Sequence, residues 1–293
     1  MKEPSRASPR HDLARLFELR KNLRCIQRDW TDNFRVHVST AESPYIEKKS
    51  YPSRFTHGKH AALREAEEHI RREYSSETEW LRCVEEEFPK YLPFLKKQCR
   101  LQFHGRILEI GAGGAWFSAE LSKLPNVVQV IATDFSQKLL REKAPKVFKL
   151  LKARGAKITR MPADFHKLDF PNNHFDFVVC SAVLHQAVSM VQALKEARRV
   201  LKPGGRIVAI REPVWPLLKF KSRSATSGEG SHAGTLKRLY TLAEYRAFFA
   251  TAGFELKASR VNLSSGFKYL FDEVVNGLTH ARYVLIAAKK ARG

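Results

Sequence analysis

A glycine-rich turn constrains the fold of this chain more than any other segment. Residues 106–110 form a short apolar run that contains one acid, Glu109, and the run breaks into Gly111-Ala112-Gly113-Gly114. A helix is expected over residues 116–123. Glycine allows so tight a turn and lets a ligand approach the backbone without meeting a Cβ atom. The N–H groups at the start of the helix favour a negative or polar group of that ligand. The segment therefore predicts a strand, a ligand-binding turn and a helix.

Two ligand classes compete for such a turn. A dinucleotide-binding turn follows Gly-x-Gly-x-x-Gly, and its third glycine allows the helix to pack closely on the strand. Counted from Gly111, that third position is the bulky Trp116. Glu109 stands two residues before the first glycine, and this resembles acidic-x-Gly-x-Gly-x-Gly, motif I of class I S-adenosylmethionine-dependent methyltransferases. Ala115 replaces the third glycine. A strand, turn and helix without any ligand is the remaining alternative.

Four later segments add to this resemblance because they follow in the order of the family. A second strand is expected at residues 127–134 and ends in Asp134, a little over twenty residues past the turn. A third ends before Asp164, a fourth before His185, and a fifth follows a Pro-Gly-Gly turn at residues 203–205. The set resembles the small-molecule, type 11-like methyltransferase domain over about residues 104–212, and more loosely over 240–290.

The resemblance implies a doubly wound, Rossmann-like α/β fold with a mostly parallel, seven-stranded sheet and a late antiparallel hairpin. The hairpin strands are expected near residues 254–257 and 283–288, after a helix at 242–252. Residues 1–10 are expected to be a disordered tail, and residues 11–100 a helical segment that covers the cofactor cleft as a lid. That segment is expected to hold helices near 12–30, 59–74 and 76–98, with an irregular stretch at 31–58. The methyltransferase domain is expected to fill residues 101–293, with an insertion at 211–240.

The resemblance also implies the cofactor, S-adenosylmethionine, with S-adenosylhomocysteine as its product. It assigns Asp134 to the ribose hydroxyls, Phe135 to the side of the adenine, and Asp164 to the adenine amino group. The backbone of Ala163 and Phe165 is expected alongside. The full set of expected cofactor contacts is Glu109, Gly111, Ala112, Gly113, Asp134, Phe135, Ala163, Asp164, Phe165 and Ser181.

Methyl transfer is an in-line displacement, so the enzyme mainly aligns the reacting atoms and excludes water. A general base is needed only where the nucleophile is protonated. His185 is the expected base because it follows the fourth strand and imidazole is a common general base in enzymes, although it could simply pack against the cofactor. Glu212 could orient a substrate donor or pair with Arg211. His232 and Tyr240 are expected substrate contacts, and a metal-free mechanism is preferred because no acid–acid–Asn cluster is recognised.

The net charge of the chain indicates which kinds of partner it could bind. The chain holds 52 Lys and Arg against 30 Asp and Glu, a net charge of +22. Such a balance favours nucleic acid, an anionic surface or a small acidic substrate, or it is only a solvated face. No apolar run approaches the length of a membrane span, and the N-terminus lacks an apolar signal core. Four scattered cysteines are expected to be thiols, so we expect a cytoplasmic protein.

Three functions are therefore open. The first is methylation of an O or N atom of a small molecule, such as an acidic or aromatic secondary metabolite. The second is a nucleic-acid methyltransferase, which the charge favours. Against it, Cys180-Ser181-Ala182-Val183 stands where an Asn/Asp-Pro-Pro-aromatic loop would hold a flipped base, and no Pro-Cys nucleophile occurs. The third is a non-catalytic cofactor-binding protein.

Overall fold

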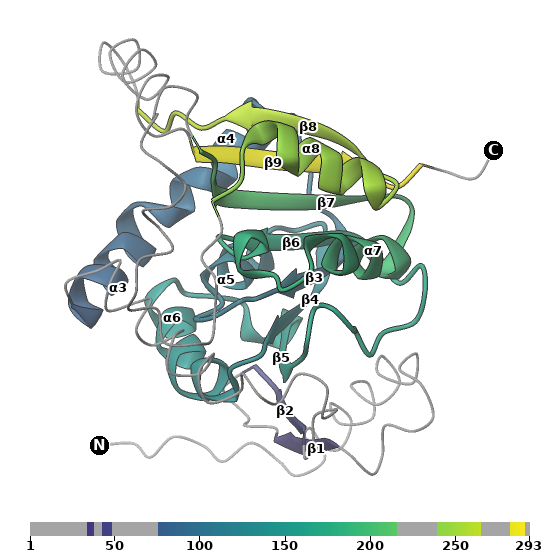
Figure 1. Cartoon of the computed structure of the whole chain (residues 1–293). Helices are drawn as coiled ribbons and strands as arrows, with labels where there is room; N and C mark the ends of the chain where they lie inside the picture. Colours follow the sequence, from purple (N-terminus) through teal and green to yellow (C-terminus); the bar gives the residue numbers. More distant parts are fainter. Residues whose placement is uncertain (1–33, 38–42, 49–75, 216–238, 265–281, 291–293) are drawn as a thin grey trace, which may run out of the picture.

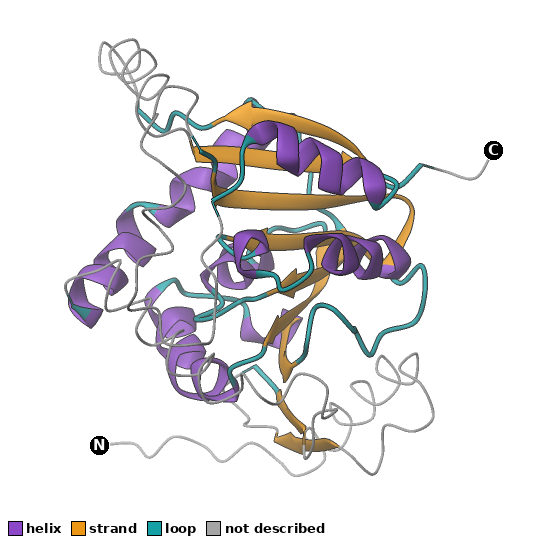
Figure 2. Ribbon diagram, viewed as in Figure 1, coloured by secondary structure: helices purple, strands orange, loops and turns teal. Residues whose placement is uncertain are grey.

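The computed structural model describes residues 34–37, 43–48, 76–215, 239–264 and 282–290. One nine-stranded sheet of order β1-β2-β5-β4-β3-β6-β7-β9-β8 forms the centre of the molecule, with helices on both faces (Figures 1 and 2). The predicted tail, the predicted helices at 12–30 and 59–74, His232 and most of the predicted insertion lie outside the described residues. No described helix has the length and apolar character that crossing a membrane requires.

Seven strands reproduce the predicted sheet. Five neighbours run parallel: β3 (Gly105–Ile110), β4 (Val127–Asp134), β5 (Ile158–Pro162), β6 (Phe175–Ser181) and β7 (Leu201–Pro213). The predicted late hairpin follows as β8 (Glu255–Arg260) and β9 (Arg282–Ala288), and β9 pairs antiparallel with both β7 and β8. Because the chain passes from β3 to β4 on one side and later to β6 on the other, the strand order switches at the carboxyl end of β3. Ligands bind at such a point in doubly wound sheets.

The strands are apolar on both sides because helices cover both faces. Ile107 and Leu108, neighbours in β3, are both fully buried but belong to different core layers. The layer that contains Leu108 is covered by α7 (Met190–Val200) and α8 (Leu242–Thr251), which lie in front of the sheet in Figure 1.

The opposite layer, which contains Ile107, is covered by helices that come before and between the first three parallel strands of the domain. The N-terminal ones are α3 (Glu77–Glu86), η3 (Phe88–Lys90) and α4 (Tyr91–Lys97), and the later ones are α5 (Trp116–Ser122) and α6 (Ala144–Leu150). The single helix predicted over residues 76–98 is therefore broken into three pieces. Pro89, which has no N–H to donate, stands at the break.

The prediction of seven strands was wrong in number, because residues 34–37 and 45–48, which were expected to be irregular, are strands. They form the antiparallel strands β1 (Phe34–His37) and β2 (Tyr45–Lys48), and β2 lies parallel to β5 with Tyr45 opposite Arg160. The buried Arg160 guanidinium donates to the carbonyls of Ser43 at 2.7 Å and Leu140 at 2.6 Å. Strand β2 forms because the backbone at the edge of β5 needs hydrogen-bond partners. This pairing involves residues far away in the chain, so the local sequence of residues 31–58 does not predict it.

Candidate active site

The glycine turn after β3 leaves one open position. Gly111 and Gly113 have φ values of +62° and +53°, a region that favours glycine. A Cβ atom on Gly111 would lie 2.5 Å from the Val183 side chain, and one on Gly114 would lie 2.6 Å from Trp80 of α3. A Cβ atom on Gly113 would meet nothing within 4 Å. Gly113 is thus the glycine of this turn that faces open space, whereas Gly111 is required by the packing of Val183.

Asp134, at the end of β4, holds this turn in place. Its Oδ2 accepts the Gly113 N–H at 2.7 Å, and its Oδ1 accepts the Ser136 N–H at 2.7 Å. Burial raises the pKa of Asp134, and the hydrogen bonds from Ser136 and Gly113 act against that rise. Each carboxylate oxygen has a second lone pair, so the acid can hold the turn and still accept a hydrogen bond from a ligand.

Glu109 lies buried beneath the same turn. Its Oε2 accepts both the backbone N–H and the hydroxyl of Ser118, in the first turn of α5. Its Oε1 has no hydrogen-bond partner among the described residues. The pKa of Glu109 is raised to about 8: burial and, to a smaller extent, the charge of Asp134 raise it, and the hydrogen bonds from Ser118 act against that rise. A buried carboxyl oxygen without a partner calls for an unseen hydrogen-bond partner, such as a ligand group.

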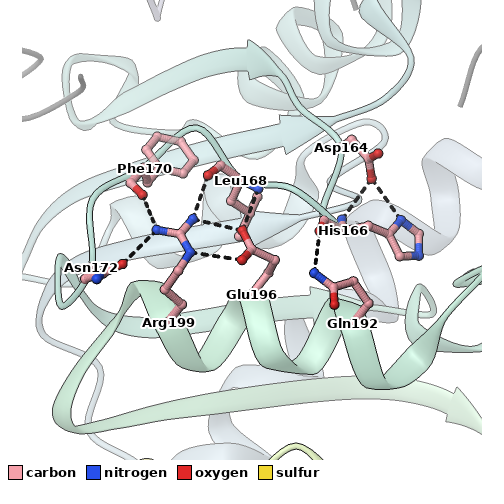
Figure 3. Close-up of polar contacts among 8 residues, drawn as sticks. All are labelled: Asp164, His166, Leu168, Phe170, Asn172, Gln192, Glu196 and Arg199. Atoms are coloured by element: carbon pink, nitrogen blue, oxygen red, sulfur yellow. Dashed lines mark hydrogen bonds and ion pairs between the residues drawn. The ribbon is translucent and has the colours of Figure 1, made fainter. Parts of the chain in front are cut away.

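The loop after β5 carries the predicted adenine contacts. Asp164 is partly exposed, and its Oδ1 accepts two hydrogen bonds from His166 (Figure 3). The N–H of Ala163 donates to the Asp134 carbonyl at 3.1 Å, so its donor is already used. Phe165 and Phe135 are partly exposed. The Oγ of Ser181, at the end of β6, is buried and has no partner within the described part of the chain.

His185 and Glu212 form a buried pair at the carboxyl ends of β6 and β7. The distance from Nδ1 of His185 to Oε2 of Glu212 is 3.0 Å. Glu212 also accepts the backbone N–H groups of Val183 at 2.8 Å, Leu184 at 3.0 Å and His185 at 3.3 Å. The alternative pairing of Glu212 with Arg211 is not what the structure shows. The guanidinium of Arg211 lies 3.9 Å from the ring centroid of Phe88 instead.

The surroundings of Glu212 determine the roles of the two ring nitrogens of His185. Burial raises the pKa of Glu212, but the hydrogen bond and charge of His185, with the N–H groups of Leu184 and Val183, lower it below its usual value overall. Glu212 is therefore an ionised acceptor, and in the neutral imidazole the Nδ1 atom carries the hydrogen that it receives. The Nε2 atom then has a free lone pair, as a general base requires.

Sequence reasoning missed one member of this cluster, Tyr245 in α8. Its hydroxyl donates to Oε2 of Glu212 at 3.3 Å. Burial, and then the charge of Glu212, raise the pKa of Tyr245 far above its usual value. The available signal was weak: one tyrosine, four residues after the Thr241 cap and four before the buried Phe249. Tyr240, a predicted substrate contact, is 8% exposed and packs its ring edgewise on Tyr245.

Backbone strain gathers at this end of the sheet. Six residues other than glycine have positive φ in the described ranges, and three of them are Ala115 (+55°), Ala182 (+57°) and Arg211 (+58°). They lie after the glycine turn, after β6 and near the end of β7. Such strain persists where the surrounding structure enforces it, and it clusters at functional sites. The described residues contain no group of three or more His, Cys, Asp or Glu side chains suited to a metal ion.

Comparison with known proteins agrees with this geometry. Residues 108–209 match the family described as "Methyltransferase domain". The ubiquinone/menaquinone biosynthesis C-methyltransferase UbiE of Pseudomonas fluorescens (strain SBW25) is 34% identical over 106 residues, which cover 36% of this chain and 41% of that protein. UbiE of Burkholderia mallei (strain SAVP1) is 30% identical over 128 residues, which cover 43% and 51% of the two chains. This chain thus spans about half the length of the curated relatives it matches, or less.

Solved structures support the fold. The YcgJ protein of Bacillus subtilis has a TM-score of 0.51 at 18% identity, and the alignment covers 69% of this chain and 98% of that one. A putative methyltransferase of Bacillus halodurans C-125 has a TM-score of 0.52 at 18% identity, over 68% and 99% of the two chains. The family match spans β3 to the middle of β7 and confirms the resemblance seen in the ordered motifs. This chain carries a class I methyltransferase domain, of the class that uses S-adenosylmethionine.

Proposed function

We propose that this protein transfers a methyl group from S-adenosylmethionine to a small molecule whose nucleophilic atom loses a proton to His185. The buried His185–Glu212 pair carries this proposal. It lies beside the glycine turn, because the space over Gly111 is filled by Val183, two residues before His185. The candidate base and the candidate cofactor turn therefore belong to one site.

The chain's residues fit the cofactor. Gly113 faces open space, and the buried Oε1 of Glu109 and Oγ of Ser181 have no hydrogen-bond partner in the described residues. In the proposal, Asp134 binds the ribose, Asp164 binds the adenine amino group, and Glu109 faces the positively charged end. When bound, S-adenosylmethionine supplies an electrophilic methyl group on a sulfonium.

The chemistry of the acceptor follows from the His185–Glu212 pair. A proton moves from the acceptor to Nε2 of His185, while Glu212 stabilises the resulting imidazolium through Nδ1. The acceptor's electron pair forms a bond to the methyl carbon as the carbon–sulfur bond breaks. His185 then releases its proton to solvent. An acceptor hydroxyl or ammonium group meets this requirement.

The acceptor atom is proposed to be O or N. A carbon atom is a third possible acceptor, because the relatives are named C-methyltransferases. The same base would serve there, since a ring hydroxyl that loses its proton makes the neighbouring ring carbons nucleophilic. The net charge of +22 favours an acidic acceptor. It also favours the second candidate, methylation of a nucleic acid. We propose the cytoplasm as the place of action because Cys83, Cys99 and Cys180 are free thiols.

The test begins with calorimetry of S-adenosylhomocysteine binding and continues with labelled methyl transfer. The protein and methyl-labelled S-adenosylmethionine are incubated with a cell extract split into small molecules and nucleic acid. Label should enter the small-molecule fraction. H185N should slow transfer about 10²–10⁴-fold and leave product binding intact, because a positioned base contributes that much. The control H174N changes another buried histidine, at the far end of the sheet.

Three outcomes would change the proposal. Binding of NADH without binding of S-adenosylhomocysteine would overturn the cofactor. Label in the nucleic-acid fraction alone would establish the second candidate. Equal transfer rates for H185N and the unmodified protein would remove His185 as the base.

A further inference from the structure

The loop between β5 and β6 is fastened to α7 along its length (Figure 3). The guanidinium of Arg199 donates to the carbonyls of Phe170 at 2.6 Å and Leu168 at 2.7 Å. Glu196 accepts the Leu168 N–H at 2.9 Å and pairs with Arg199 at 2.8 Å. These contacts hold the loop in one position relative to α7. Asp164, the proposed adenine contact, lies at the start of this loop.

His166 connects Asp164 to the same helix. Both its backbone N–H and its Nδ1 lie 2.8 Å from Oδ1 of Asp164. Its carbonyl accepts the side-chain amide of Gln192 in α7 at 3.3 Å, as Figure 3 shows. On the far side of the ring, Nε2 accepts the backbone N–H of Ser189 at 3.3 Å. Ser189 caps the start of α7 and lies four residues after His185.

The contact with Ser189 fixes the tautomer of His166. A backbone N–H can only donate, so the Nε2 atom that receives it carries no hydrogen. The ring hydrogen is then on Nδ1, and His166 donates it to Asp164. Oδ1 of Asp164 consequently receives two hydrogen bonds, while Oδ2 has no hydrogen bond within the described residues. The carboxylate is held so that one oxygen is saturated and the other is open.

We propose that His166 is a positioning residue: it orients Asp164 so that this side chain presents only a hydrogen-bond acceptor to the base of the cofactor. With Oδ1 occupied, Oδ2 selects a purine that carries an amino group and disfavours one that carries a carbonyl in its place. This inference rests on the proposed function, because it assumes that Asp164 faces the adenine. The new part is that His166 sets the orientation of Asp164 and that this orientation determines which base is bound.

The substitution D164N tests whether His166 orients the side chain at position 164. In D164N the amide has one acceptor and one donor end. The two donors of His166 would hold the amide oxygen on their side, so the amide NH₂ would face the base. The preference should then reverse, from an amino purine to a carbonyl purine. Without His166 the amide has no reason to adopt that orientation, and the reversal should disappear in D164N/H166A.

The experiment is calorimetry with S-adenosylhomocysteine and its deaminated analogue S-inosylhomocysteine, on the full chain. The unmodified protein should bind the adenosyl compound at least about tenfold more tightly, because a buried acceptor left facing a carbonyl is costly. H166A should reduce that ratio to within about threefold, and H166N, whose amide can donate to Asp164, should restore part of it. Q192A is the matched control: it removes a contact of the same residue but leaves the ring and Asp164 untouched, so its ratio should not change.

The outcomes are distinct. If the unmodified protein binds neither compound, the proposed function fails. If it binds and discriminates, but H166A keeps the full ratio or weakens both compounds by the same factor, His166 is only structural and this inference is overturned. Failure of D164N to reverse the preference, in a variant that still binds, overturns it as well. Melting temperatures of all variants show which of them are folded.

Discussion

Oε2 of Glu212, near the end of β7, lies 3.0 Å from Nδ1 of His185, which follows the adjacent parallel strand β6 by four residues. The same carboxylate binds three consecutive N–H groups, those of Val183, Leu184 and His185. It therefore fixes both the backbone that carries the histidine and the orientation of its ring. A candidate base held in this way has little freedom to be in the wrong place when substrate arrives.

E212Q should reduce turnover about 10²–10⁴-fold, the contribution of a positioned base. The new amide NH₂ would have to face a hydrogen-bond donor, because all five contacts of Glu212 are donors. The measurement is single-turnover methyl transfer together with urea unfolding. E244Q is the control: Glu244 also accepts a backbone N–H, that of Thr241 at 2.8 Å, but at the start of α8. An E212Q protein that is folded and fully active would refute the role of the pair.

Y245F should move the acid limb of the pH–rate profile to higher pH, by up to about one unit. The phenol stays protonated, since burial and Glu212 raise its pKa, so it always donates to the carboxylate. Without that donor the negative charge of Glu212 is less compensated, so the His185–Glu212 pair binds a proton more strongly and loses it only at higher pH. Rates measured from about pH 5 to pH 9 test this. A packing role alone would lower stability and leave the profile where it was.

The unmodified protein should lose stability as pH rises toward 8, and E109Q should lose less. The folded protein raises the pKa of Glu109 from 4.5 to about 8, chiefly by burial, so it retains a proton that the unfolded chain releases. This contribution is complete below about pH 4.5 and falls as pH rises toward 8, by a few kcal/mol at about 1.4 kcal/mol per pKa unit. Urea unfolding at about pH 5 and pH 8 should show the loss in the unmodified protein and a smaller one in E109Q. Equal losses in both proteins would show that Glu109 is already charged when folded.

G113A and G111A should fail in different ways. At Gly113 the added methyl group meets no protein atom, so the fold should survive at a cost of about 1–2 kcal/mol for the positive φ, while binding of S-adenosylhomocysteine is lost. At Gly111 the methyl group would overlap Val183, so the fold itself should weaken. Truncating the neighbour in G111A/V183A should recover part of that stability. Thermal melting and calorimetry separate the two effects; normal binding by G113A would place the ligand elsewhere.

Reversing the charge of the basic insertion tests the substrate class. Five of its cations lie outside the described residues: Lys219, Lys221, Arg223, Lys237 and Arg238. If they capture an acidic substrate, KM should rise with a smaller effect on kcat. If they bind nucleic acid, affinity should fall and its dependence on salt should become shallower. The matched control reverses five exposed cations of the described surface: Lys96, Lys97, Lys152, Lys195 and Arg246. Equal effects of the two sets would mean that only net charge matters.

The sequence was sufficient for the parts of the fold that have a local signal. Strands β3 to β7 were predictable because each is a short apolar run followed by a turn, and His185 could be placed because it follows such a run. Tyr245 and the β1–β2 hairpin were not predictable, since each acquires its role from residues far away in the chain. The suggested pairing of Glu212 with Arg211 could have been doubted from the start, because neighbours in a strand point to opposite faces. The contact of Gly111 with Val183 required the structure.

The buried guanidinium of Arg160 limits how far the protein can be shortened. It holds the backbone beside β2 against the edge of β5, so a fragment that starts after residue 75 would lose the Ser43 acceptor of a buried cation. The same cut would uncover the edge of β5, and exposed strand edges pair with those of other molecules. Fragments trimmed to the matched residues 108–209 should therefore aggregate. Strand β2 and Ser43, which lie far outside the matched residues in the sequence, therefore shield an edge of the sheet.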